Sequence, residues 1–158
     1  MLTVWNPMLS FREVLLTVHA GRLVAAAQPI RQGRAVPLVL EQMCRLRAHP
    51  SSVDVMEGHL AVERAAARLG RLGLVNTCLI RSLALSALLA DQDDVQLHLG
   101  FRPSSSPKAV LAGHAWVTLD HRAIPNDSAT LAEGQPCEEV AVLTARRVKT
   151  SRQDEVRS

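Results

Sequence analysis

The chain has 158 residues, of which 47% are apolar, and this is enough for one domain with a proper hydrophobic core. A net charge of +3 is too small to argue for nucleic-acid binding, and no apolar run reaches the roughly 18 residues of a membrane span. The first residues lack the basic flank and apolar run of a signal peptide, so we expect a cytoplasmic protein.

Three cysteines, Cys44, Cys78 and Cys137, are spread widely along the chain and form no Cys-x-x-Cys motif. An odd number at such spacing predicts neither a disulfide framework nor a usual zinc site. We therefore expect no metal, no cofactor and at least one free thiol. Cys44 lies within an apolar helix pattern and is expected in the core, whereas no histidine pattern accompanies Cys137.

The first half of the chain has the three- and four-residue apolar spacing of helices. Ser10 and Glu13 have the spacing of a capping box, which predicts that a helix begins just after Ser10. In a later helix, Asp54 is expected within the first turn. Three helices are expected: one from Ser10 that ends by Pro29 and Gly33, one from about Pro37 that stops before Pro50, and one from near Ser52 to Gly70.

A fourth helix begins at Cys78, which occupies its first turn, and either Asn76 or Thr77 can cap it. The helix runs to about Ala90 and carries leucine or alanine on most of its sides. Because helices that are apolar on most sides are usually central, we expect it to be buried on several faces.

The second half of the chain changes to the two-residue alternation of strands. Four strands are expected, at Val95–Phe101, Val110–Leu119, Arg122–Pro125 and Val140–Leu143. The acidic pair Glu138-Glu139 is expected in a solvated turn. Helices followed by a small antiparallel sheet predict an α+β fold. We expect one domain over residues 1–148, with a helical part over about 1–75 and a catalytic part over about 76–148, and a polar tail over 149–158.

Cys78 is the candidate nucleophile. A cysteine reacts as its thiolate, and the free N–H groups at a helix N-terminus favour negative charge there. An isolated cysteine at such a position is more often a buried structural residue. A second group is therefore needed to support a catalytic role.

His114 is the candidate base. Alternation along its strand places His114, Trp116 and Thr118 on one face and the apolar residues on the other, which we expect to face the core: Ala115, Val117 and Leu119. His114 is therefore expected in a polar layer.

Hairpin geometry supplies a partner for His114. If Asp120-His121 form a two-residue turn, Leu119 pairs with Arg122. Counting five residues away from the turn, from Leu119 to His114 and from Arg122 to Asp127, places these two residues opposite each other on the same face. A carboxylate there fits the orienting member of a nucleophile–base–acid triad.

Two other residues remain candidates for the orienting role. Pro125 weakens the strand ladder, so the pairing can shift by one and bring Asn126 to the imidazole. Asp120, in the turn itself, is the weaker alternative. The other five histidines have no partner that the sequence identifies: His19, His49, His59, His98 and His121.

Several blocks of the sequence resemble the transglutaminase-like cysteine peptidases of lasso-peptide biosynthesis: Arg64–Leu69, Thr77–Leu85 with Leu88-Leu89, and Gly113–Val117. These are leader peptidases related to the C-terminal domain of the microcin maturation protease, and the resemblance covers roughly residues 60–130. It implies a papain/transglutaminase-like fold and a Cys-His-Asp triad, with Cys78 as nucleophile and His114 as base. The acid falls in Ile124–Asp127, one residue later than the family pattern gives.

The same resemblance implies that the protein removes the leader from a ribosomally made precursor peptide. The family's leaders are captured by a small winged-helix domain, either fused or separate. The helical first half argues against a fused one, so we expect the stand-alone form, a separate leader-recognition protein and an ATP-dependent lasso cyclase as partners. The alternatives are another acyl transfer on the same triad, such as transamidation or N-acyl transfer, and a non-catalytic peptide-binding module.

Overall fold

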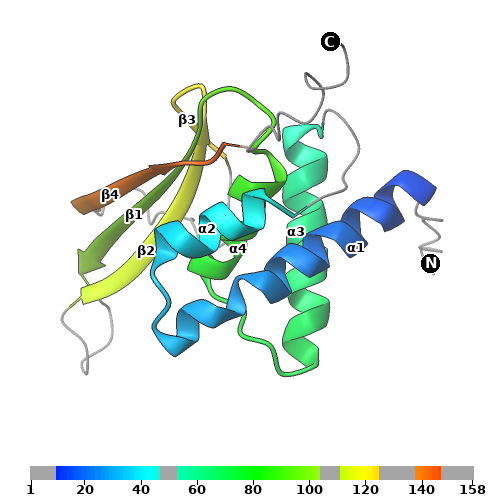
Figure 1. The fold of residues 1–158 in the computed structure, drawn as a ribbon, viewed down its shortest axis with the longest axis horizontal. Coiled ribbons are helices and arrows are strands. Elements are labelled where there is room, and N and C mark those ends of the chain that lie inside the picture. Colours follow the sequence, from blue (N-terminus) through cyan, green and yellow to red (C-terminus); the bar gives the residue numbers. More distant parts are fainter. Residues whose placement is uncertain (1–9, 47–52, 104–110, 125–137, 147–158) are drawn as a thin grey trace, which may run out of the picture.

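The computed structural model describes residues 10–46, 53–103, 111–124 and 138–146, and in these residues the helices cover one face of a four-stranded antiparallel sheet (Figure 1). This is the expected α+β architecture. The elements in chain order are α1 (Phe11–Ala26), the 3₁₀ helix η1 (Gln28–Gln32), α2 (Val36–Cys44), α3 (Val55–Arg71), α4 (Cys78–Leu88), β1 (Val95–Pro103), β2 (Leu111–Leu119), β3 (Arg122–Ala123) and β4 (Glu138–Thr144).

The capping box at the start of α1 is confirmed. The Ser10 hydroxyl accepts from the Glu13 N–H, and the Glu13 carboxylate accepts from the Ser10 N–H at 2.7 Å. Hydrogen bonds from the Ser10 backbone and side chain, with a smaller contribution from Arg64, lower the pKa of Glu13 below its usual value. The start of α1 is thus fixed by contacts within four residues.

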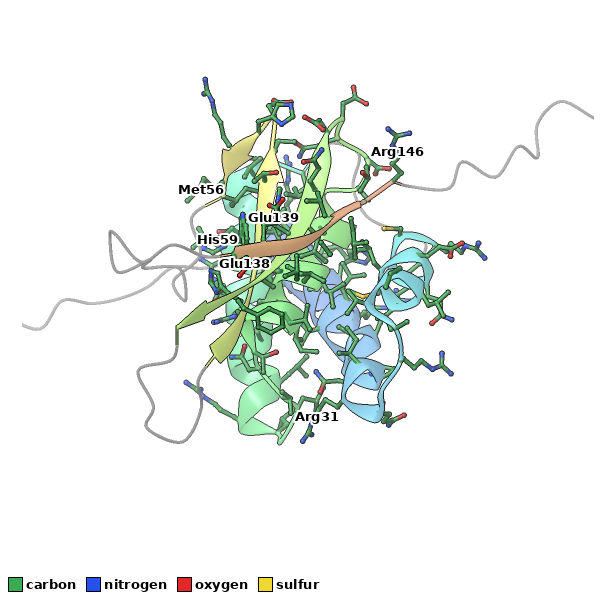
Figure 2. All side chains as sticks on the ribbon, turned by 90° about the vertical axis from the view of Figure 1, so that its left-hand side faces the viewer. Arg31, Met56, His59, Glu138, Glu139 and Arg146 are labelled. Atoms are coloured by element: carbon green, nitrogen blue, oxygen red, sulfur yellow. The ribbon has the colours of Figure 1, made fainter. Side chains whose placement is uncertain are left out.

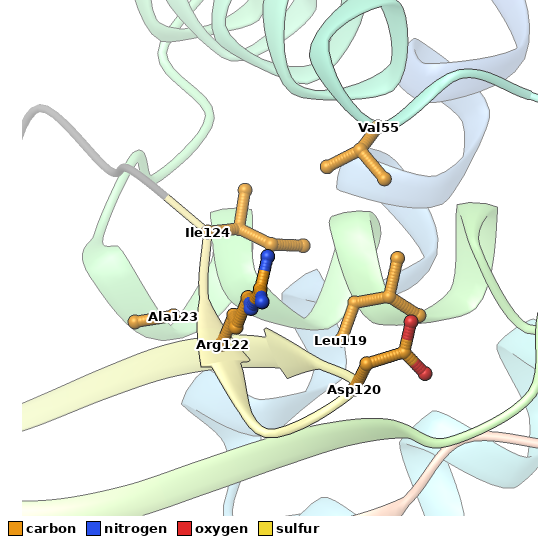
Figure 3. A pocket seen from close by; sticks show the side chains of 6 residues that line it. All are labelled: Val55, Leu119, Asp120, Arg122, Ala123 and Ile124. Carbon is orange, nitrogen blue, oxygen red and sulfur yellow. The ribbon is translucent and has the colours of Figure 1, made fainter.

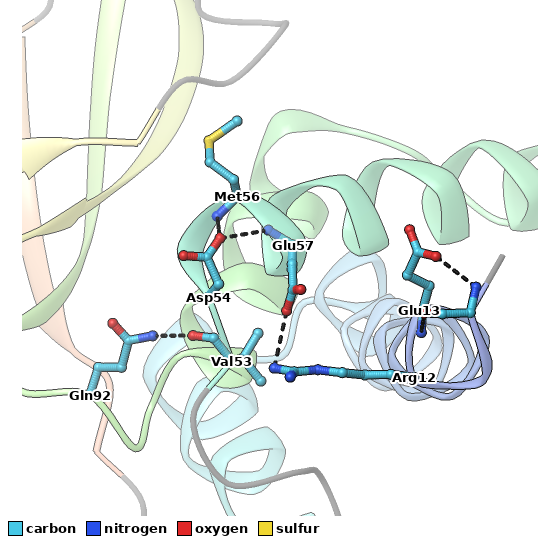
Figure 4. A network of polar contacts seen from close by, with 8 residues as sticks. Arg12, Glu13, Val53, Asp54, Met56, Glu57 and Gln92 are labelled. Carbon is cyan, nitrogen blue, oxygen red and sulfur yellow. Dashed lines mark hydrogen bonds and ion pairs between the residues drawn. The ribbon is translucent and has the colours of Figure 1, made fainter. Parts of the chain in front are cut away.

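Helix α3 begins one residue after Asp54, which caps it (Figure 4). The Asp54 carboxylate accepts from the backbone N–H groups of Met56 and Glu57, at 2.9 and 3.2 Å. The prediction that Asp54 lies inside the first turn was therefore wrong by one position, because an Asp side chain is favoured at the cap, where it accepts from the unpaired N–H groups of the turn that follows it. An ion pair from Arg12 of α1 to Glu57 joins the two helices there.

Helix α4 is the central helix, as predicted. It contacts α1, α2 and α3 as well as β1 and β2. Thr77 rather than Asn76 is its N-cap, and every residue of α4 after Arg81 is buried. Its first residue, Cys78, is only partly buried and packs against the core.

The sheet has the order β3-β2-β1-β4, so β2 is an inner strand and β3 and β4 are the outer ones. Ala115 and Val117 of β2 are buried on the helix side, as predicted. The prediction of a short third strand at the edge, next to β2, is also confirmed.

The acidic pair Glu138-Glu139 begins β4 instead of lying in a turn, so that expectation was wrong (Figure 2). Glu138 pairs with Phe101 and Glu139 with Gly100, and a register shift between Leu99 and Gly100 joins them to the rest of β4. Charged residues and bulges are common on outer strands, where they oppose edge-to-edge association. The composition that suggested a turn is thus equally suited to an outer strand.

Several predicted features lie outside the described residues: Asn126, Asp127, Cys137 and the tail over 149–158. Within the described ranges, none of the helices has the length and apolar character that crossing a membrane requires.

Candidate active site

Cys78 is the first residue of α4, immediately after its cap. The Thr77 hydroxyl accepts from the Ile80 N–H at 3.3 Å. The N–H groups of Cys78 and Leu79 lie in the first turn, where no carbonyl of the helix is placed to accept from them. The Cys78 side chain is half-buried against the edge of the core. A thiol at the positive end of a helix, partly open to solvent, has the environment that nucleophilic cysteines use.

A buried hydrogen bond ties α4 to β2 near the candidate base. The Ser82 hydroxyl donates to the Ala115 carbonyl at 3.0 Å, and Ser82 is 1% exposed. Ser82 lies one helical turn after Cys78 on the same side of α4, and Ala115 directly follows His114. Each candidate residue is therefore close in sequence to one end of this bond.

The relative direction of α4 and β2 locates the nucleophile more closely. Ser82 contacts Ala115, and Leu85, which follows Ser82 in α4, lines a small cavity with Val117, which follows Ala115 in β2, so the two elements run the same way. One helical turn back from Ser82 is roughly 5.4 Å, or about two residues of a strand. Cys78 is therefore near the level of Gly113 and His114 along β2.

Ser82 reaches β2 from the side on which β3 lies. The Ile124 N–H donates to the Val117 carbonyl at 2.9 Å, and carbonyls two residues apart on a strand point to the same side. The Ala115 carbonyl therefore also points toward the β3 side, and it is there that Ser82 contacts it. The first turns of α4 consequently lie along an edge of β2, beside the strand that carries His114.

The predicted hairpin register is confirmed as far as the structure describes it. Leu119 pairs with Arg122, and the Ile124–Val117 hydrogen bond continues the same register. Asp120 and His121 both have positive φ, of 49° and 61°, as a two-residue type I′ turn requires. Asp127 opposite His114 stays a prediction, because it lies outside the described residues.

Asp120 lies far from the candidate base. It is in the hairpin turn, six residues along β2 from His114, and a strand rises about 3.3 Å per residue. An exposed carboxylate about 20 Å along the strand cannot orient the His114 ring. The alternatives that remain are Asp127 and Asn126.

His114 is 6% exposed and lies on the face of β2 opposite Ala115. Its ring stacks on that of Trp116, with centroids 5.6 Å apart and planes 22° apart. The thiol of Cys78 and the ring of His114, both in the described part of the chain, are not hydrogen-bonded to each other. Catalytic hydrogen bonds commonly tighten only when substrate binds, so this geometry is compatible with a nucleophile–base pair.

A second histidine, which the sequence did not single out, belongs to the same layer. His98 of β1 pairs with Trp116, and their rings stack at 5.2 Å with planes 12° apart. Its Nδ1 lies 2.5 Å from a Glu139 carboxylate oxygen, and its Nε2 lies 2.9 Å from the Thr118 hydroxyl. The alternation of apolar and polar residues along β1 could have identified His98 from the sequence. Leu97 and Leu99 face the core, so His98 lies on the opposite face, together with His114.

An ion pair braces the first turns of α4 against α3. Arg81 Nη1 lies 3.1 Å from Glu63 Oε2, and both side chains are largely buried. The pair borders the same cavity of about 10 Å³, which is at the lower limit for a single water molecule. Close packing therefore leaves the helix that carries Cys78 little freedom to shift against α3.

A larger cavity of about 500 Å³ lies at the hairpin, away from Cys78 (Figure 3). Val55 and Ile124 form apolar parts of its lining, and Asp120 and Arg122 supply charged side chains. Leu119, at the end of β2 remote from His114, also lines it. This position makes it a poor candidate for the reaction itself.

The remaining chemistry-bearing groups do not form a second centre in the described residues. Cys44 is 5% exposed within the core, as predicted. Across the described ranges, no cluster of three or more His, Cys, Asp and Glu side chains has the arrangement of a metal site.

Comparison with known proteins gives one match. The family model described as the transglutaminase-like superfamily matches residues 14–138. The matched range begins in α1 and ends at the start of β4, so it includes Cys78, His114 and the segment that holds Asp127. No curated protein and no solved structure matches the chain.

Proposed function

Since the chain belongs to the transglutaminase-like superfamily, we propose that it is a cysteine peptidase that removes the leader from a ribosomally made lasso-peptide precursor. Cysteine proteases and acyl-transfer enzymes are the activities that a transglutaminase-like domain suggests. The finer assignment rests on the resemblance of the Cys78 and His114 sequence blocks to lasso-peptide leader peptidases.

In the proposed mechanism the Cys78 thiolate attacks the scissile carbonyl carbon of the precursor. His114, protonated by the thiol, gives its proton to the leaving amine as the C–N bond breaks, and an acyl-enzyme remains on Cys78. Water, deprotonated by His114, then attacks the thioester and releases the leader with a new carboxylate. Asp127 orients the His114 ring and stabilises its protonated form.

The observation that carries this proposal is the Ser82–Ala115 hydrogen bond. It joins the helix of the nucleophile to the strand of the base, next to His114 and one turn from Cys78. A pair that must stay within reach through two chemical steps needs such a rigid connection, because small misplacements lower catalytic rates steeply.

The helix N-terminus also supplies an oxyanion donor. The Cys78 N–H belongs to the first turn of α4, where backbone N–H groups have no intrahelical acceptor. A donor fixed in a helix stabilises the developing oxyanion without having to reorganise. We assign this role to the Cys78 N–H.

The proposed partners are the precursor peptide, a separate leader-recognition protein and an ATP-dependent lasso cyclase. Helices α1 and α3 pack against each other and against α4. They therefore support the core that carries Cys78, and the proposal of a separate leader-recognition protein rests on the sequence resemblance to lasso-peptide leader peptidases.

The test is incubation of the protein with a lasso-precursor peptide and its leader-recognition protein, followed by mass spectrometry. We expect an intact leader ending in a free carboxylate, and loss of this product with Cys78→Ala. Cys44→Ala is the matched control, because it removes a thiol from the core of α2 while leaving α4 intact. Equal cleavage by wild type and Cys78→Ala contradicts a catalytic role and favours a peptide-binding module.

The same experiment separates hydrolysis from acyl transfer, which the superfamily also includes. A transferase leaves the leader joined to an amine acceptor, so the product mass exceeds that of the free carboxylate by the acceptor minus water. Such an adduct, lost with Cys78→Ala, replaces the peptidase assignment with a transferase on the same residues.

A further inference from the structure

Three aromatic rings form a column on the face of the sheet away from the helices. Trp116 stacks on His114 at 5.6 Å and on His98 at 5.2 Å, with interplanar angles of 22° and 12°. His114 and Trp116 are two residues apart on β2, and His98 is directly opposite Trp116 on β1. The orientation of the His114 ring is thus coupled to that of His98 through Trp116.

The His98 end of the column is held by two hydrogen bonds. A carboxylate only accepts, so the Nδ1–H of His98 donates to Glu139 at 2.5 Å. The other nitrogen, Nε2, lies 2.9 Å from the Thr118 hydroxyl. With both ring nitrogens bound, on β4 and β2 respectively, the His98 ring cannot rotate without breaking a hydrogen bond.

We propose that Glu139 and His98 are positioning residues, which hold the ring of His114 through Trp116. The proposal rests on the proposed function, in which His114 moves protons to and from the substrate. A proton carrier must keep its ring aligned with both the thiol and the leaving group.

Glu139 allows this idea to be tested without damaging the core. Its side chain is 45% exposed, whereas the His98 side chain is 13% exposed. Glu138, its neighbour on β4, has the same charge and is also exposed. Glu138→Ala is therefore a control with the same change of charge on the same strand.

The first measurement is steady-state cleavage of the precursor peptide. Glu139→Ala is expected to lower kcat roughly tenfold with little change in KM, because ring misalignment affects the transition state more than binding. Glu139→Gln keeps an acceptor for His98 and should recover most of the loss, and Glu138→Ala should match wild type.

The second measurement does not depend on peptidase activity. Two-bond ¹H–¹⁵N spectra of histidine-labelled protein report the ring of each histidine, and His114→Gln identifies the His114 signals. Glu139→Ala is expected to shift the His114 ring signals, since the stack on Trp116 loosens, and Glu138→Ala is expected to leave them in place.

The outcomes separate this inference from the proposed function. If the wild type cleaves no precursor, the proposed function fails, and the His114 spectra alone decide whether the column positions the ring. Unchanged His114 signals in Glu139→Ala overturn the inference, even if kcat falls, because Glu139 then acts by another route. A spectral shift equal to that of Glu138→Ala overturns it as well.

Discussion

The two faces of the sheet differ in what covers them and in what holds them together. On the helix side, apolar side chains from β1 and β2 are at most 2% exposed: Val95, Leu97, Ala115 and Val117. On the other side the same two strands carry stacked rings and hydrogen bonds: His98, His114, Trp116 and Thr118. One face is held by dispersion and the hydrophobic effect, and the other by directional contacts.

This difference separates stability from positioning. The free energy gained by burying apolar side chains depends on the buried area and changes little with small shifts, so it stabilises the packing of α4 on the sheet. Stacked rings and hydrogen bonds depend on angle and distance, so they suit a face that must orient a proton carrier. Because successive residues of a strand point to opposite faces, β2 contributes to both without conflict.

The largest loss of stability is expected from a substitution that creates a cavity on the helix side of the sheet. Leu97 is fully buried, and Leu97→Ala should lower the free energy of unfolding by about 3 kcal/mol. Val142, which pairs with His98 on the other side and is 43% exposed, is the matched site. Val142→Ala should cost less than about 1 kcal/mol, since little area is buried there. Urea denaturation of both variants tests the contrast, and equal losses would contradict it.

A smaller effect is expected from two buried serines of α4. Ser82→Ala leaves the Ala115 carbonyl without its hydroxyl donor and should cost about 1 kcal/mol. Ser86 is fully buried, and its hydroxyl has no hydrogen-bond partner among the residues that the structure describes. Ser86→Ala removes that unsatisfied group and should stabilise the protein by up to about 1 kcal/mol.

Thermal unfolding of the two serine variants gives the measurement. Opposite shifts of the melting temperature are expected from the same chemical change on the same helix. Shifts of the same sign and size would mean that the Ser82–Ala115 bond does not secure α4 to β2.

The smallest effect is expected at the hairpin turn, where both faces end. His121 has a φ of 61°, a conformation that glycine adopts without strain. His121→Gly should stabilise the protein by about 0.5 kcal/mol, the relief of strain being partly offset by the greater entropy of the unfolded chain. His121→Ala keeps a Cβ and should give no such gain. Both lose the exposed contact with Asp94, so their difference in denaturation midpoint isolates the backbone effect.

Features that depend on near neighbours were predictable from the sequence. The Ser10–Glu13 capping box, the cap of Cys78's helix and the two-residue turn between β2 and β3 are each decided within a few residues. The error at Glu138-Glu139 arose because a turn and an outer strand favour similar polar residues, and only pairing with β1 distinguishes them.

The sequence by itself therefore determined the helix-first, sheet-second order, the position of Cys78 at a helix N-terminus and the face on which His114 lies. Only the tertiary structure decided the contacts that surround them. Ser82 meets Ala115 across 33 residues, and His98 meets Glu139 across 41. The physical reason is that periodicity and capping act along the chain, whereas the approach of α4 to the edge of β2 and of β4 to β1 depends on how complete elements pack.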